Sequence, residues 1–110
     1  MNDIPFKLKG HARSDLESIR KYTIKKWDKA QWVKYKEILY RRMQALANNP
    51  LLGLAITDIS DNAFRFPDGI HVFYYLKRQK DVVFVGVISS SMAPGKHLIR
   101  KKDIESELKF

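Results

Sequence analysis

The sequence predicts an α+β domain in which an antiparallel helical hairpin packs on a mostly antiparallel, four-stranded sheet. Three observations favour this fold. The N-terminus alternates apolar and polar residues, two helical periods follow with a very short linker, and three β-rich segments then alternate with turn residues. A chain of 110 residues, 45% of them apolar, has room for one such core and not for two.

The first predicted element is a strand over residues 4–9. Ile4, Phe6 and Leu8 alternate there with a proline and two lysines, as in a strand with one buried face. Because proline cannot donate to a ladder, Pro5 favours an edge position or the start of the strand.

Two amphipathic helices are predicted next. The first begins at Ala12 and lasts about four turns, with apolar residues on one stripe. The second begins at Asp28, which forms a capping box with Gln31, and ends before Pro50. The short linker makes the pair an antiparallel hairpin, with Trp27 and Tyr35 expected to close the bend.

The second half is predicted to be a loop over residues 51–62, then strands over 63–66, 70–76 and 82–88. The hairpin covers one face of this sheet, so the other face is expected to be solvated or to bind a partner. Residues 96–110 are charged and weakly periodic. They predict either a short C-terminal helix or an extension that orders only with a partner, so we divide the chain into a domain (1–95) and an extension (96–110).

The charge of the chain is strongly positive. Twenty-one Lys and Arg against twelve Asp and Glu give +9, and residues 1–50 carry +7 of it. Such a field favours an anionic partner, although surface charge that only keeps the chain soluble is the alternative. No cysteine is present, which excludes disulfides and thiol chemistry. The chain has no signal-peptide pattern and no apolar run of the roughly 20 residues that span a bilayer, so we expect a soluble, cytoplasmic protein without membrane contact.

The sequence shows little sign of catalytic chemistry. His11, His71 and His97 lack metal-ligand spacing, and no cofactor motif is present, so we expect no metal, no cofactor and no catalytic residue. A metal-free ribonuclease remains an alternative, with Arg65, His71, Tyr75 and Lys77 as acid, base and cations. The competing interpretation packs the His71 and Tyr75 rings against the hairpin. Trp32 or Tyr40 is the aromatic residue expected to contact a partner.

Several motifs occur in a fixed order between residues 4 and 93. They are Ala12-x-x-Asp15-Leu16-x-x-Ile19-x-x-Tyr22-Thr23, Gln31-x-x-x-Tyr35, Asn49-Pro50-x-Leu52-Gly53, and Phe66-Pro67-x-Gly69-x-His71, with Ser91-Met92 after the last strand. In this order and spacing the chain resembles ParE-type toxins of bacterial toxin–antitoxin modules, which belong to the RelE/ParE superfamily.

The resemblance implies a RelE/ParE-like fold and a toxin of a plasmid stabilisation system. It also implies a cognate ParD-like antitoxin whose acidic, flexible C-terminal tail wraps the toxin, and DNA gyrase as the target, inhibited by protein binding. Direct nucleic-acid binding is then expected only within a complex. The alternatives are a ribosome-dependent mRNA endoribonuclease of the RelE branch and an attenuated, non-toxic binding module.

Two positions depart from the family pattern. Phe64 stands where the family commonly has an arginine, and Ser89 where it often has a histidine. Both departures weaken a nuclease interpretation and leave open an attenuated toxin. For contacts with the antitoxin or the target, the candidates lie around the sheet and along the first helix: Arg13, Arg20, Phe64, Arg65, His71 and Tyr75.

Overall fold

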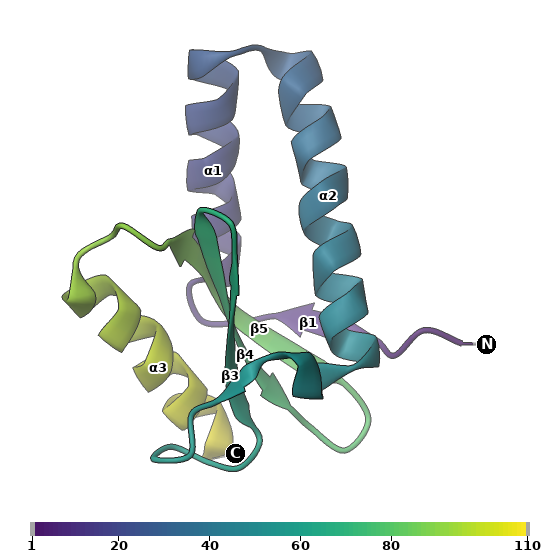
Figure 1. Cartoon of the computed structure of the whole chain (residues 1–110), viewed down its shortest axis with the longest axis vertical. Helices are drawn as coiled ribbons and strands as arrows, with labels where there is room; N and C mark the ends of the chain where they lie inside the picture. Colours follow the sequence, from purple (N-terminus) through teal and green to yellow (C-terminus); the bar gives the residue numbers. More distant parts are fainter. Residues whose placement is uncertain (1, 110) are drawn as a thin grey trace.

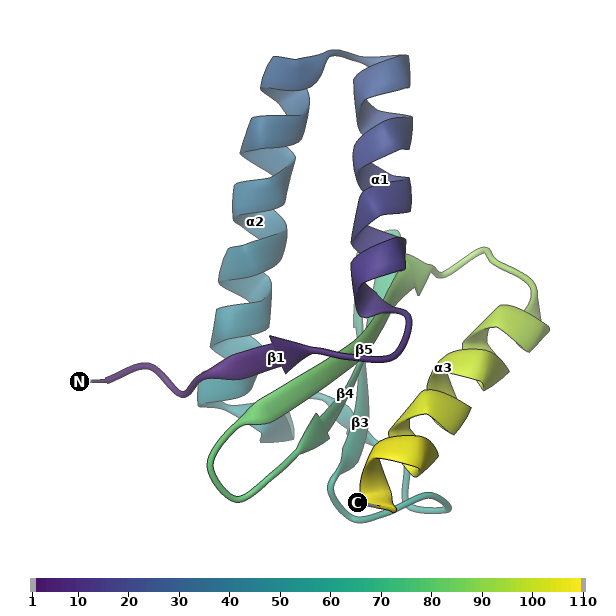
Figure 2. The same cartoon turned by 180° about the vertical axis from the view of Figure 1, so that it is seen from behind.

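A computed structural model describes residues 2–109 of the chain (Figure 1). The elements are β1 (Phe6–Leu8), α1 (Ala12–Lys26), α2 (Lys29–Asn48), the short 3-10 helix η1 (Pro50–Leu52), β2 (Leu54–Ala55), β3 (Ala63–Asp68), β4 (His71–Lys77), β5 (Val82–Ser89) and α3 (Pro94–Leu108). Helices α1 and α2 form an antiparallel hairpin whose closed end projects well beyond the sheet (Figures 1 and 2).

The hairpin forms for the local reasons that the sequence indicates. The Asp28 carboxylate accepts a hydrogen bond of 2.7 Å from the Gln31 N–H, which caps α2 as predicted. Helix α2 ends at Asn48, because the Asn49-Pro50 pair that follows disfavours helical geometry. The prediction of two helices and a tight bend is confirmed.

Within residues 2–109, the sheet contains five strands in the order β1-β5-β4-β3-β2. Strands β2 to β5 pair antiparallel with their neighbours, and β1 pairs parallel with β5. The mostly antiparallel character is therefore confirmed, but the predicted number of four strands is wrong. The additional strand, β2, has two residues and lies inside the segment predicted as a loop. So short a strand has no periodicity of its own, and pairing with β3 creates it.

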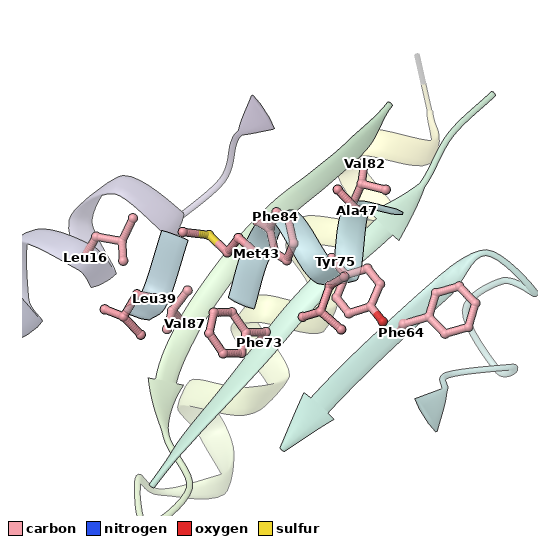
Figure 3. Packing of buried hydrophobic residues seen from close by; sticks show 11 residues of the cluster. Leu16, Leu39, Met43, Ala47, Phe64, Phe73, Tyr75, Val82, Phe84 and Val87 are labelled. Atoms are coloured by element: carbon pink, nitrogen blue, oxygen red, sulfur yellow. The ribbon is translucent and has the colours of Figure 1, made fainter. Parts of the chain in front are cut away.

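The hairpin covers one face of the sheet and buries the larger, aromatic part of the core. We call this cluster the hairpin-side core (Figure 3). Phe73, Tyr75 and Phe84 are fully buried in it, below Leu39 and Met43 of α2. Their ring centroids lie 5.3 Å apart for Tyr75 and Phe84, and 6.3 Å apart for Phe73 and Phe84, within the range of favourable aromatic pairs.

Helix α3 covers the opposite face, so the expectation that this face is solvated or open for binding is wrong. Val72, Tyr74 and Leu76 of β4 lie there, as strand alternation predicts, together with Val85 of β5. We call this cluster the α3-side core. Ile104 is the α3 residue that contributes a fully buried apolar side chain to it. The domain boundary at residue 95 stays a prediction, although α3 begins at Pro94 and packs on the sheet.

Polar contacts fasten α3 in addition to Ile104. His97, Arg100 and Asp103 are spaced by three residues and so lie on one stripe of the helix. His97 Nδ1 lies 2.7 Å from the Tyr74 hydroxyl, and Asp103 Oδ2 lies 2.5 Å from His11 Nδ1. Arg100 forms an ion pair with Asp15, described below. Because these three residues are polar or charged, the sequence predicts that they face solvent and does not indicate that they pack on the sheet.

Candidate functional site

A groove of about 630 Å³ opens between the helical hairpin and the ends of β4 and β5. We call it the hairpin groove. Its helical wall carries Tyr22, Trp27 and Tyr35, and its sheet wall carries Ile70 and His71. Further lining residues come from α1, α2, the end of β5 and the start of α3: Asp15, Ser18, Ile19, Thr23, Gln31, Val87, Ile88, Ser89, Met92, Lys96 and Arg100. Apolar walls with a few polar groups are typical of binding sites.

A buried ion pair lies at the inner end of the groove. Arg100 donates to both carboxylate oxygens of Asp15, with distances of 2.5 and 2.9 Å, and both side chains are over nine-tenths buried. Asp15 also accepts the Val87 N–H at 3.0 Å. A buried ion pair is stable only when each charge has its partner, so Asp15 holds α1, β5 and α3 together and is not available as an acid or base.

Gly86, which lies next to a β-bulge, leaves room for the Arg100 side chain of this ion pair. The register between β4 and β5 shifts after Tyr74, which pairs with Gly86, while Tyr75 pairs with Phe84. A Cβ on Gly86 would lie 2.7 Å from the Arg100 side chain. Glycine is therefore required where the arginine crosses β5.

A neutral hydrogen-bonded pair forms the polar part of the sheet wall. The Tyr35 hydroxyl lies 2.6 Å from Nδ1 of His71, which is buried. Burial lowers the pKa of His71 below its ordinary value, although the Asp68 carboxylate opposes that effect. Burial and, to a smaller extent, Asp68 raise the pKa of Tyr35. Both side chains are therefore uncharged at neutral pH and hold each other in place.

Two large aromatic rings form the outer rim of the groove and face solvent. Tyr22 is 62% exposed and Trp27 is 66% exposed. The Lys26 ammonium lies 5.6 Å from the centroid of the Tyr22 ring and 5.8 Å from that of Trp27. The expectation that Trp27 closes the bend by packing is wrong, because its ring is left outside. Of the two aromatic residues expected to contact a partner, Trp32 is partly buried against the hairpin-side core and Tyr40 is 37% exposed.

A second depression, of about 610 Å³, lies along the edge strand β1. Lys7, Lys9 and Arg13 give it positive charge, and Phe6 and Tyr40 give it an aromatic lining. It is separate from the hairpin groove, with which it shares no lining residue. Within residues 2–109, no group of three His, Asp or Glu side chains is arranged to hold a metal ion.

A family model described as "ParE toxin of type II toxin-antitoxin system, parDE" matches residues 6–94. The chain belongs to this ParE toxin family. A search of curated proteins finds no match to it. The family match stops at the first residue of α3, so the helix that closes the second face of the sheet lies almost entirely outside the matched segment.

The site residues predicted for this ParE-family toxin do not come together in one place. His71 lines the hairpin groove, Arg13 lines the β1 depression, and Arg20 pairs with Glu17 on the surface of α1. Arg65 pairs in register with Tyr74, a residue of the α3-side core, and is partly buried.

Phe64 and Tyr75 are buried in the hairpin-side core and present no surface to a partner. The Tyr75 hydroxyl donates to the Pro50 carbonyl at 2.6 Å, and burial raises the pKa of Tyr75 to about 12. A Cβ on Gly53 would lie 2.2 Å from that hydroxyl. Tyr75 therefore anchors η1. At position 64, where the family commonly has an arginine, the phenylalanine ring packs in the hairpin-side core.

Sequence reasoning missed four residues that shape the hairpin groove of this ParE toxin: Trp27, Tyr35, Lys96 and Arg100. The sequence predicts packing at the bend for Tyr35 and Trp27, not a place in a groove. Lys96 and Arg100 belong to α3, whose docking the sequence did not reveal. Asp15 carried a usable signal, because a carboxylate on the apolar stripe of an amphipathic helix requires a buried partner.

Proposed function

We propose that this ParE-family toxin acts in the cytoplasm by binding DNA gyrase, without catalysing a reaction, and that a ParD-like antitoxin with an acidic C-terminal tail neutralises it. The family membership gives the coarser statement, a toxin of a type II toxin–antitoxin system. The hairpin groove is the observation that supports the more specific proposal of protein binding.

The groove suits binding better than catalysis. Its buried ionisable groups are occupied by each other, since Asp15 pairs with Arg100 and His71 with Tyr35. Its rim is apolar and exposed at Ile70, Met92 and Trp27. Exposed apolar and aromatic side chains around a concave surface are typical of protein interfaces. Within residues 2–109, no helix is long and apolar enough to cross a membrane.

The charge of the chain supports an acidic antitoxin tail. A net charge of +9 accelerates the encounter with a negatively charged segment, while apolar contacts in the groove slow dissociation. A flexible tail loses entropy when it orders on the toxin, and burial of its aliphatic side chains offsets that loss.

Expression of the chain alone and together with the antitoxin that we expect a neighbouring open reading frame to encode tests the module. We expect growth arrest from the toxin alone and recovery with its neighbour. Purified toxin should inhibit supercoiling by gyrase and leave mRNA intact in a translation extract. Ribosome-dependent cleavage of mRNA would overturn the proposal in favour of the RelE-branch nuclease, and normal growth would overturn it in favour of the attenuated module.

A matched pair of variants tests whether the groove makes the contact. Ile70→Asp places a carboxylate on the groove wall at a side chain that is 67% exposed. Val33→Asp makes the same change at a 62% exposed position of α2 that does not line the groove. We expect Ile70→Asp to abolish gyrase inhibition and Val33→Asp to preserve it. Equal inhibition by both variants would show that the groove is not the binding surface.

A further inference from the structure

Most of the net positive charge of the chain lies in one segment, at the closed end of the helical hairpin. Residues 20–36, which we call the hairpin tip, hold seven of the 21 Lys and Arg and one of the 12 Asp and Glu. The tip therefore carries +6 of the net charge of +9. Its one carboxylate, Asp28, is engaged in capping α2. In the part of the chain that the structure describes, Arg20 is the tip cation that forms an ion pair.

The tip also exposes two aromatic rings at its centre. Tyr22 and Trp27 face solvent, and Lys26 lies over both rings and donates to the Tyr22 hydroxyl at 3.2 Å. Both ring distances are within the range of a cation–π interaction. Lys21, Lys25 and Lys29 are exposed around them.

The tip is accessible from several sides. Both views show the hairpin extending away from the sheet, so that its closed end stands apart from the rest of the molecule (Figures 1 and 2). The lysines occupy several faces of the two helices instead of one stripe. Lys21 and Lys25 lie on α1, and α2 carries Lys29, Lys34 and Lys36, of which Lys34 and Lys36 point in different directions because they are two residues apart. A helical stripe of cations would suit one flat acidic protein surface. Cations on several sides suit a flexible polyanion.

We propose that the hairpin tip binds single-stranded nucleic acid directly. The lysines neutralise successive phosphates, and an unpaired base stacks on Trp27 or Tyr22. Sequence-tolerant proteins bind single strands with this combination of cations and exposed aromatic rings. The groove behind the rings adds space for a base, with Gln31 and Ser18 beside it as hydrogen-bonding groups. The proposal does not require gyrase as the target, although the oligonucleotide would share Trp27 and the groove with the protein contact proposed above. It reverses the expectation that nucleic-acid binding requires a complex.

Fluorescence anisotropy with a labelled 12-nucleotide oligo(dT) and the purified full chain tests the proposal. We expect a Kd of about 1–100 μM at 0.15 M salt, with affinity falling steeply as salt rises. Trp27→Leu should weaken binding about tenfold, because it removes the stacking surface. Trp27→Phe should stay within about twofold of the parent, because it keeps an aromatic ring.

Two pairs of lysine substitutions separate local from general electrostatics. Lys25→Gln with Lys29→Gln removes two charges from the tip, and Lys77→Gln with Lys80→Gln removes two exposed charges around the β4–β5 turn. The tip pair should reduce the slope of log affinity against log salt by about 1.4, from about 0.7 per phosphate contact. The control pair should leave the slope unchanged. Equal effects of the two pairs would overturn the proposal.

Tryptophan fluorescence gives a second readout. The chain has two tryptophans, so Trp32→Phe leaves Trp27 as the reporter, and base stacking should quench its emission. Binding of a 12-residue polyglutamate as tight as that of oligo(dT) would overturn the proposal in favour of an acidic protein partner. Trp27→Leu that binds oligo(dT) as tightly as the parent would also overturn it.

Discussion

The two helical covers of the sheet are held in different ways. Helices α1 and α2 bury a continuous apolar and aromatic cluster, with Leu39, Met43 and Leu46 at most 3% exposed. Helix α3 buries one apolar side chain fully, Ile104, and is otherwise fastened by His97, Arg100 and Asp103. Apolar burial contributes in proportion to the buried area and is shared among many side chains, so losing one of them lowers stability without detaching the helices. Hydrogen bonds and ion pairs depend on individual partners, so α3 is the helix that a single substitution can detach from the sheet.

The largest expected effect comes from the hairpin-side core. Phe84 is fully buried between Phe6, Phe73 and Tyr75, with ring centroids 5.3 to 6.3 Å away. Phe84→Ala should lower the free energy of unfolding by about 3–5 kcal/mol, because the cavity left by a ring cannot close. Urea denaturation followed by circular dichroism measures the loss. Ile99→Ala on the exposed face of α3 is the control and should change stability by less than about 0.5 kcal/mol.

The second prediction separates α3 from the rest of the fold. Arg100→Met leaves the buried Asp15 carboxylate without its cation, which costs about 3–5 kcal/mol when no relaxation occurs. We expect about 3 kcal/mol, since α3 can lift and admit water to Asp15. Amide hydrogen exchange should then accelerate in α3 while α2 stays protected.

The control for Arg100→Met is Lys102→Met, which removes an exposed cation from the same helix. It should leave the exchange of α3 unchanged. If Arg100→Met accelerated α2 and α3 equally, the two covers would unfold as one unit, and the contrast between them would be lost.

The third prediction concerns the contact between Tyr75 and η1 on the hairpin side. Tyr75→Phe removes the hydrogen bond to the Pro50 carbonyl and should cost about 1 kcal/mol. Gly53→Ala pushes a methyl group against the same hydroxyl and should cost about 1–3 kcal/mol. The double variant should lose less than the sum of the two, because Tyr75→Phe removes the atom that the new methyl group meets. Strict additivity in urea denaturation would contradict this account, and Tyr22→Phe at an exposed tyrosine provides the neutral control.

The same contrast explains how far the sequence predicts the fold. The hairpin side was predictable because its periodicity, the Asp28 cap and the Asn49-Pro50 stop are local signals. The α3 side was not, because its contacts use residues that a periodicity analysis assigns to solvent. Parallel pairing of β1 with β5 joins residues that are distant in the sequence, such as Phe6 and Val82, and has no local signal.

The candidate site was predicted less well than the fold. Strand alternation puts His71, Phe73 and Tyr75 on one face of β4, but it does not say how deeply each side chain is covered. Tyr75 lies under η1, whereas His71 lies at the end of the strand, where the groove opens. Depth depends on where the helices cross the sheet, which is decided by packing between segments far apart in the sequence.

The smallest predicted effect is a pH dependence centred on His71, which lies in the groove beside the hairpin. Burial lowers the pKa of His71 in the folded chain below its ordinary value of 6.5. Below about pH 6.5 the unfolded chain therefore binds a proton at His71 more readily than the folded chain does. The free energy of unfolding has its full value above about pH 6.5 and declines as the pH falls below it. Urea denaturation between pH 5 and 8 should show this slope. His71→Gln should remove this slope, and the control His97→Gln should preserve it. The Asp81 carboxyl does not contribute between pH 5 and 8, because its ion pair with Arg78 lowers its pKa below the ordinary value of 3.8. A slope that persists in His71→Gln would show that the burial of His71 is not its cause.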